Sequence, residues 1–169
     1  MTLDTPSTTD LCDRLKDRAR FLSPRLANFG GRLRFHGAVV TLKCFEDSSR
    51  IKEAITRPGA GKVLVVDAGG SDRCAVFGDM SAETALANGW EGVVIHGYLR
   101  DVQRIGQMPI GVRALGVVPR GSTRRDQGLA DLPIEINGVP CHPGDQMFAD
   151  EDGIVLVARA DLPLPAVQG

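Results

Sequence analysis

The segment spanning residues 78–101 constrains the fold most, because it combines a loop, a short helix, a turn and a buried strand. A run of good helix formers follows Gly78, and Asn88 with Gly89 supplies a C-terminal stop. Residues 92–96 read GVVIH, a short β-branched apolar run that is typical of a buried strand. A helix followed by a strand in this way brings the two ends of the segment back to one edge of a sheet.

These two ends carry groups that suit a small anion and a divalent cation. The backbone N–H groups at the start of the helix have no intrahelical partners and carry a partial positive charge. A carboxylate or a phosphate can bind there. At the other end, Arg100 can hold a carboxylate through paired hydrogen bonds, and Asp101 offers hard oxygen ligands. We therefore expect one cleft to be shared by Gly78, Asp79, Met80, Ser81, Arg100 and Asp101.

Structural roles for the same residues stay open. Asp79 or Ser81 can cap the helix, and Asp101 can cap the helical turn that follows it. Arg100 can form a surface ion pair with Asp101, which would contribute little to stability. Glu83 lies one helical turn after Asp79 on the same face, and its position indicates an exposed charge.

The composition excludes several classes of function. With 43% hydrophobic and 24% charged residues, a chain of 169 residues is typical of one globular domain with its own core. The net charge of −1 gives no general attraction to nucleic acid, and no apolar run approaches the roughly 20 residues that span a bilayer. The N-terminal sequence lacks the basic and apolar regions of a signal peptide, so we expect a cytoplasmic protein.

Other residues that often carry chemistry lack a supporting pattern. Gly69 and Gly70 follow the apolar run KVLVVD without the spacing of a dinucleotide or P-loop motif, which predicts a structural turn that could wall the cleft. His96 reads as a hydrogen-bonded strand residue, and neither a Ser-His-Asp set nor a Schiff-base lysine stands out. The cysteines are expected as reduced, small core residues rather than zinc ligands; they are Cys12, Cys44, Cys74 and Cys141.

The remaining chain predicts a mixed α/β domain with hairpins late in the sequence. A first helix is predicted to be closed by Pro24 and to carry on one face Leu11, Leu15, Ala19 and Leu22. Asn137 and Gly138 predict a type I′ hairpin, and a second helix follows Asp47 and Ser48. Further strands are predicted within residues 37–45, 62–67, 73–77, 111–118 and 154–157. One domain is expected over residues 1–169, with loose tails at 1–6 and 161–169.

The chain also resembles a known family. Asp79 is followed, after twenty intervening residues, by Arg100 and Asp101, which matches the signature of the class II 4-hydroxy-4-methyl-2-oxoglutarate aldolases. The surrounding segments resemble the RraA-like family (regulator of ribonuclease activity A) over about residues 8–157; they are FGGRLRFHGAVVTLKCFED (29–47), GKVLVVDAGGSDRCAVFGD (61–79), NGWEGVVIHGYLRD (88–101) and FADEDGIVLV (148–157). The resemblance implies a β/β/α layered fold of the phosphohistidine-swivelling type, assembled as a homotrimer.

The resemblance further implies a metal-dependent aldolase. Asp101 would be the direct ligand of Mg²⁺ or Mn²⁺, and Asp79 would hold a metal-bound water. Arg100 and the N–H groups of Met80 and Ser81 would bind the carboxylate of a 2-oxo acid substrate. Cleavage of 4-hydroxy-4-methyl-2-oxoglutarate would release pyruvate, and oxaloacetate would be decarboxylated through the same pyruvate enolate. Longer relatives donate a C-terminal acidic residue to a neighbouring metal site, for which this sequence shows no clear counterpart.

A second hypothesis is a regulator that binds and inhibits ribonuclease E, as the family name implies. Such a role needs a partner surface rather than a metal site, and residues 119–128 form a loop with three arginines, Arg120, Arg124 and Arg125. We interpret this loop as a solvated or intersubunit segment. A third possibility, a menaquinone-pathway methyltransferase, lacks the expected glycine pattern.

Overall fold

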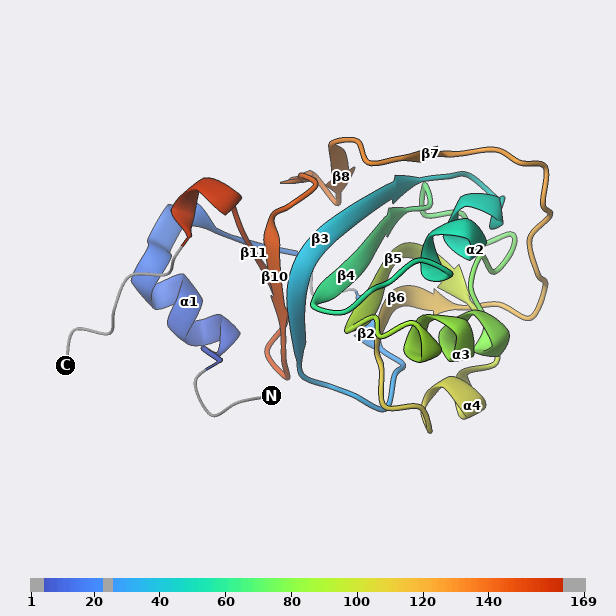
Figure 1. The fold of residues 1–169 in the computed structure, drawn as a ribbon, viewed down its shortest axis with the longest axis horizontal. Coiled ribbons are helices and arrows are strands. Elements are labelled where there is room, and N and C mark those ends of the chain that lie inside the picture. The colour runs from blue at the N-terminus through green and yellow to red at the C-terminus, as the bar shows by residue number, and fades with distance from the viewer. Residues whose placement is uncertain (1–4, 23–25, 163–169) are drawn as a thin grey trace.

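Four parallel strands form the centre of the sheet in the computed structural model, which describes residues 5–22 and 26–162 (Figure 1). In spatial order they are β3 (Phe35–Lys43), β4 (Lys62–Asp67), β5 (Gly92–Leu99) and β6 (Gly111–Val117). The connections between them contain helices, namely α2 (Ser49–Ile55), α3 (Asp79–Ala87) and α4 (Val102–Ile105). All three helices cover the same face of the sheet (Figure 1).

Shorter antiparallel strands extend this centre on both sides. Nine strands of the described residues form the sheet, and a separate hairpin joins β8 (Ile134–Ile136) to β9 (Val139–Cys141). The added strands are β1 (Ala19–Phe21), β2 (Ala27–Asn28), β7 (Leu129–Ala130), β10 (Gln146–Ala149) and β11 (Ile154–Val157). The remaining helical elements are α1 (Thr8–Leu15) and the 3-10 turns η1 (Lys16–Arg18) and η2 (Arg159–Asp161).

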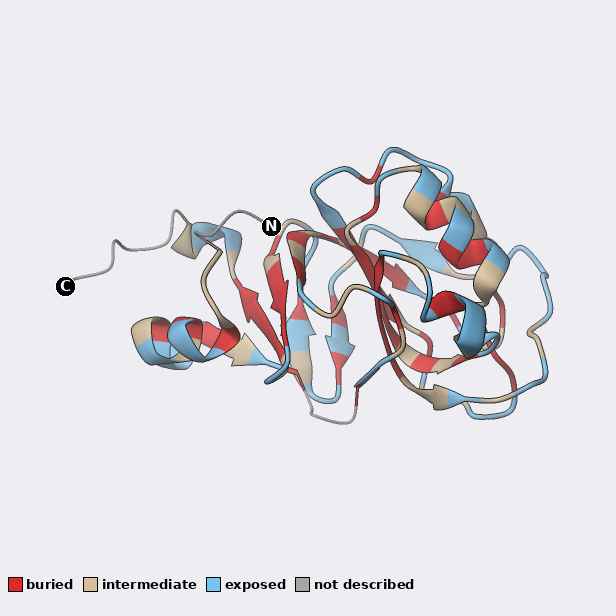
Figure 2. Cartoon of the chain, turned by 90° about the horizontal axis from the view of Figure 1, so that it is seen from below, coloured by how far each residue is buried: buried red, intermediate tan, exposed pale blue. Residues whose placement is uncertain are grey.

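Buried residues run along the strands of the sheet (Figure 2), and their apolar side chains form clusters against both of its faces. One cluster packs the strands against α2, α3 and α4 and includes Ile55, Leu64 and Ile95. A second cluster on the other face packs Phe35 and Val65 against β8 to β11. The architecture is therefore the predicted α/β fold, a β/β/α layered arrangement with a mixed sheet and flanking helices. Within the described ranges, no helix is long and apolar enough to cross a membrane.

Several local predictions are confirmed. The second helix, the strand at 62–67 and the turn at Asn88 and Gly89 occur as expected. Asn137 and Gly138 both have positive φ and close the β8–β9 hairpin. All four cysteines are free thiols, and burial raises the pKa of Cys44 and of Cys141 to about 12. These two thiols therefore stay protonated and unreactive near neutral pH.

The predicted first helix was wrong beyond Leu15. The chain turns at Lys16, which has a φ of 51°, and residues 19–21 then pair with β11 instead of continuing the helix. Ala19 and Leu22 are buried as predicted, but Ala19 lies in a strand and Leu22 directly follows it, so neither belongs to a helix. The predicted role of Pro24 lies outside the described residues, as do most of the two predicted tails.

Two further predictions need correction. Residues 73–77 form no strand; Ala75 and Phe77 make only isolated bridges, to Gly121 and Leu99. The strand β10 was missed, because its sequence QMFA is short and lacks an alternating pattern.

Candidate functional site

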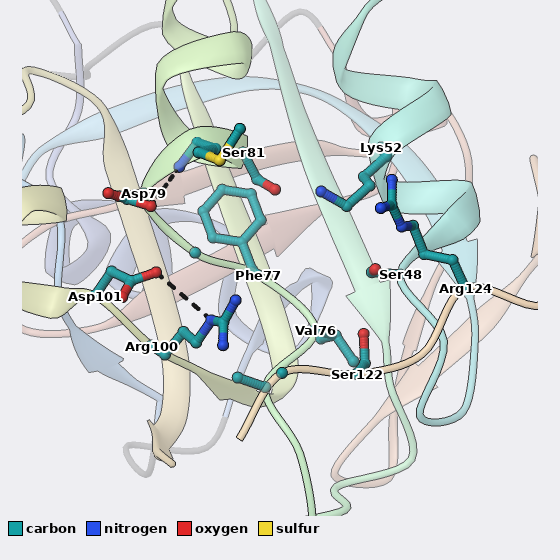
Figure 3. A pocket seen from close by; sticks show the side chains of 14 residues that line it. Ser48, Lys52, Val76, Phe77, Asp79, Ser81, Arg100, Asp101, Ser122 and Arg124 are labelled. Carbon is teal, nitrogen blue, oxygen red and sulfur yellow. Dashed lines mark hydrogen bonds and ion pairs between the residues drawn. The ribbon is translucent and has the colours of Figure 1, made fainter. Parts of the chain in front are cut away.

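A cavity of about 170 Å³ lies where the parallel strands end and the helices begin (Figure 3). This edge of a parallel sheet, beyond the carboxyl ends of the strands, is where α/β proteins commonly bind ligands. Four segments of the chain line it: the start of α2, residues 75–81, the Arg100 and Asp101 pair, and the loop at 121–124. All six residues predicted to share a cleft line this one cavity.

Backbone pairing brings the two ends of the 78–101 segment together. The Arg100 N–H donates to the Phe77 carbonyl at 3.0 Å, directly after the bridge between Phe77 and Leu99. Gly78 then passes so close to Asp101 that a Cβ at this position would lie 2.8 Å from the Asp101 Oδ2 atom. A larger residue at this position would therefore have to displace the Asp101 carboxylate from the start of α3.

Asp101 occupies a left-handed backbone conformation, with φ 62° and ψ 34°. Aspartate tolerates this region better than most residues. The Asp101 carbonyl accepts hydrogen bonds from the N–H groups of Arg104 and Ile105, which begin α4. Its side chain makes no capping hydrogen bond, so the alternative capping role is not supported. The carboxylate is 41% exposed and lies 3.6 Å from the Arg100 Nε atom.

Asp79 is held by an arginine that the sequence analysis did not single out. Its Oδ2 atom accepts from Arg104 Nη1 at 2.6 Å, and Arg104 Nη2 donates to Glu83 at 2.5 Å. Its Oδ1 atom accepts from the Met80 N–H at 2.8 Å. The N-cap residue of α3 is Gly78, so neither Asp79 nor Ser81 is the predicted N-cap, although Asp79 accepts from one N–H of the first turn.

The first turn of α3 therefore offers fewer N–H donors than expected. The Met80 N–H already donates to Asp79, whereas the Ser81 N–H has no hydrogen-bond partner in the part of the chain that the structure describes. Ser81 itself is buried and lines the cavity, while the Met80 side chain is 72% exposed. Ser81 is thus the more available of the two expected donors.

The opposite wall was not foreseen from the sequence. Ser48 and Lys52 come from the start of α2, and Ser122 and Arg124 come from the arginine-containing loop (Figure 3). The predicted solvated or intersubunit loop thus contributes Arg124 to the cavity. No sequence signal marks this wall, because it depends on contacts between segments about 75 residues apart.

Asp47 joins these two segments. Its carboxylate is almost fully buried and accepts hydrogen bonds from the N–H groups of Ser49, at 2.8 Å, and Arg125, at 2.5 Å. Burial raises the pKa of Asp47, but hydrogen bonds from Ser49, Arg125 and Gln127 outweigh it and hold the pKa below its ordinary value. The ionised carboxylate therefore fixes the loop against α2.

The glycine turn and the histidine lie elsewhere. Gly69 and Gly70, both with positive φ, pack against the side chains of Phe45 and His96 and do not line the cavity, so this turn is not a wall of the cleft. His96 Nε2 lies 2.8 Å from the Asn137 Oδ1 atom, which supplies the expected hydrogen-bond partner.

The donor set suits one kind of metal ion. No three His, Cys, Asp or Glu side chains cluster as a metal site anywhere in residues 5–22 and 26–162. A closed zinc cage therefore does not fit. Asp101 is an accessible carboxylate. Its Oδ2 atom lies beside Gly78, close to where a larger residue would place its Cβ. A cation such as Mg²⁺, which takes one or two protein carboxylates and fills its shell with water and substrate oxygens, does fit.

Comparison with known proteins shows similarity over nearly the whole chain. The family model described as RraA-like (Aldolase/RraA) matches residues 8–156. A protein of Pseudomonas syringae pv. tomato is 50% identical over 158 residues, covering 94% of this chain and 97% of its own length. One from Laribacter hongkongensis is 47% identical, covering 88% of this chain and 93% of its own length. Both carry the name "Putative 4-hydroxy-4-methyl-2-oxoglutarate aldolase".

Two solved structures have the same fold as this chain. The RNA-processing inhibitor RraA from Thermus thermophilis aligns with a TM-score of 0.88 and 42% identity, covering 90% of this chain and 93% of that one. A structure described as S-adenosylmethionine: 2-dimethylmenaquinone methyltransferase from Geobacillus kaustophilus aligns with a TM-score of 0.90 and 39% identity. The alignment covers 96% of this chain and 100% of that one.

Replacing Asp47 by asparagine is expected to loosen the loop wall and to lower the free energy of unfolding by about 1–3 kcal/mol at pH 7. Because the folded pKa is depressed, the stabilisation is present above the ordinary Asp pKa of about 3.9 and is lost as the pH falls through the lower folded value. Urea unfolding should therefore show the gap between wild type and Asp47→Asn narrowing from pH 7 to pH 3.

Hydrogen exchange at residues 121–126 should be faster in this variant at pH 7. The matched control is Asp17→Asn, at an exposed position outside this loop. A gap in stability that stays constant with pH would contradict the role assigned to the ionised carboxylate.

Proposed function

The chain belongs to the RraA-like family, and we propose that it is a divalent-metal-dependent class II aldolase that cleaves 4-hydroxy-4-methyl-2-oxoglutarate to pyruvate. Related 4-hydroxy-2-oxo acids and oxaloacetate are the further proposed substrates. The observation that carries the proposal is the convergence of Arg100, Asp101 and the first turn of α3 on one cavity. The names of the relatives at about half identity support the same reaction class.

The size of the cavity favours a small substrate. Pockets for drug-sized ligands measure about 300–1,000 Å³, whereas this one has about 170 Å³. A five- or six-carbon acid is therefore a better match than a nucleotide. The sequence after β4 also lacks a nucleotide-binding glycine pattern, so we do not extend the methyltransferase activity named for the Geobacillus structure to this chain.

In the proposed reaction the bond between C3 and C4 breaks. The C4 hydroxyl loses its proton, C4 becomes a carbonyl carbon, and the electron pair moves onto the 2-oxo group as the pyruvate enolate. C3 then takes up a proton from water, which gives pyruvate. Arg100 and the Ser81 N–H hold the C1 carboxylate, and the Arg100 charge lies beside the developing enolate. Asp79, kept in position by Arg104, orients a water molecule that takes the hydroxyl proton.

Mg²⁺ or Mn²⁺ held by Asp101 would supply Lewis-acid polarisation of the 2-oxo group. Decarboxylation of oxaloacetate uses the same enolate, because CO₂ leaves in place of the aldehyde or ketone fragment. Arg100 and Ser81 then have the same task of holding the C1 carboxylate, and no proton needs to be removed from a hydroxyl group.

Replacing Arg100 or Asp101 by alanine is expected to lower kcat/KM by at least about 100-fold, the loss typical of removing one group that stabilises an oxyanion. Pyruvate release from 4-hydroxy-4-methyl-2-oxoglutarate, coupled to lactate dehydrogenase, measures this with Mg²⁺ or with EDTA. Arg34→Ala is the control, because Arg34 forms an exposed ion pair with Glu151 outside the cavity. Wild-type turnover no higher than that of metal alone would refute the proposal.

A regulator of ribonuclease E is the second candidate. The likeness to the RNA-processing inhibitor from Thermus favours it. A hollow next to the cavity also carries Arg73, Arg120 and Arg125 beside the exposed ring of Phe45, which offers a surface for a protein partner. Binding of ribonuclease E that survives Arg100→Ala, together with no turnover, would favour this function over the aldolase.

We also propose that the protein is a cytoplasmic homotrimer. Exposed large apolar side chains near the cavity, Met80 and Phe45, support burial of this region by another subunit. Gel filtration with light scattering should give three times the 18.1 kDa of one chain. A stable monomer at micromolar concentration would rule out the trimer.

A further inference from the structure

The wall of the cavity opposite Asp79 and Asp101 is cationic (Figure 3). Lys52 reaches it from α2, and Arg124 reaches it from the loop that Asp47 holds in place. The hydroxyl-bearing residues Ser48 and Ser122 line the same wall. This wall therefore combines two positive charges with neutral hydrogen-bond donors.

Neither of these cations has an acidic partner among the residues that the structure describes. Across the described ranges, Lys52 and Arg124 take part in no ion pair or side-chain hydrogen bond. The acidic residues close to them in the sequence form ion pairs with other arginines. Glu53 pairs with Arg50 and Arg57, and Asp126 pairs with Arg50. Two other basic residues near the cavity do have acidic partners; they are Arg104, with Asp79 and Glu83, and Arg73, with Glu46.

Two unpaired cations facing one small cavity favour an anionic ligand there. The carboxylate of pyruvate would be bound at the far wall by Arg100 and Ser81 under the proposed function, and would leave this wall without a partner. A substrate with a second carboxylate at its other end would supply one.

We propose that Lys52 and Arg124 form a subsite for the second carboxylate of the substrate. This subsite restricts the enzyme to 4-hydroxy-2-oxo acids that are dicarboxylates and disfavours those that end in an alkyl group. The assignment rests on the proposed function, which places the first carboxylate at Arg100.

Two non-cleavable ligands test the subsite by calorimetry in the presence of Mg²⁺. 2-Oxoglutarate and 2-oxopentanoate share the 2-oxo acid head and a five-carbon chain, and neither has the C4 hydroxyl that the aldol cleavage requires. They differ in the second carboxylate. Wild-type protein should bind 2-oxoglutarate at least about tenfold more tightly, the effect of one charge-assisted hydrogen bond.

Lys52→Met and Arg124→Met should each remove most of this preference while leaving the affinity for 2-oxopentanoate unchanged. Lys62→Met is the matched control, because Lys62 is exposed at the start of β4 and lies outside the cavity. The subsite would be overturned if wild type bound the two ligands equally or bound neither. It would also be overturned if Lys52→Met lowered the affinity for both ligands equally.

Turnover separates this inference from the proposed function. A preference for 2-oxoglutarate that depends on Lys52, without any release of pyruvate, would sustain the subsite and refute the aldolase. Equal kcat/KM for 4-hydroxy-4-methyl-2-oxoglutarate and for 4-hydroxy-4-methyl-2-oxopentanoate would sustain the aldolase and overturn the subsite.

Discussion

The backbone hydrogen bond from Arg100 to Phe77 is the contact on which the site depends. It joins the end of β5 to the residues that lead into α3, although about twenty residues separate the two points in the sequence. Gly78 is thereby placed against Asp101, and the first turn of α3 opens toward the same cavity as Arg100. The parallel sheet supplies the rigid frame, and this one pairing aligns a cation, a carboxylate and a helix start.

This half of the site could be predicted because its signals are local. Helix formers after Gly78, the stop at Asn88 and the apolar run of β5 are all read within one segment. The other half could not, because Lys52 and Arg124 come together through contacts between distant segments, such as the hydrogen bond from Arg125 to Asp47, 78 positions apart. The first helix was mispredicted for a related reason, since apolar spacing that fits a helix also suits a strand docked against β11.

Charge balance links the two halves. Arg104 already neutralises Asp79 and Glu83, so Asp101 is the carboxylate left available at one end of the cavity. At the other end, Lys52 and Arg124 have no acidic partner within residues 5–22 and 26–162. A divalent cation on Asp101 and a dicarboxylate across the cavity would satisfy both ends at once, which is why the proposed substrate and the proposed subsite support each other.

The most direct test of this account is a crystal structure with Mn²⁺ and oxalate, which resembles the pyruvate enolate. Anomalous scattering should locate one Mn²⁺ bound by the Asp101 carboxylate, with oxalate bridging the metal, Arg100 and the Ser81 N–H. Mn²⁺ bound without Asp101, or oxalate bound away from Arg100, would contradict the assignment of this cavity as the active site.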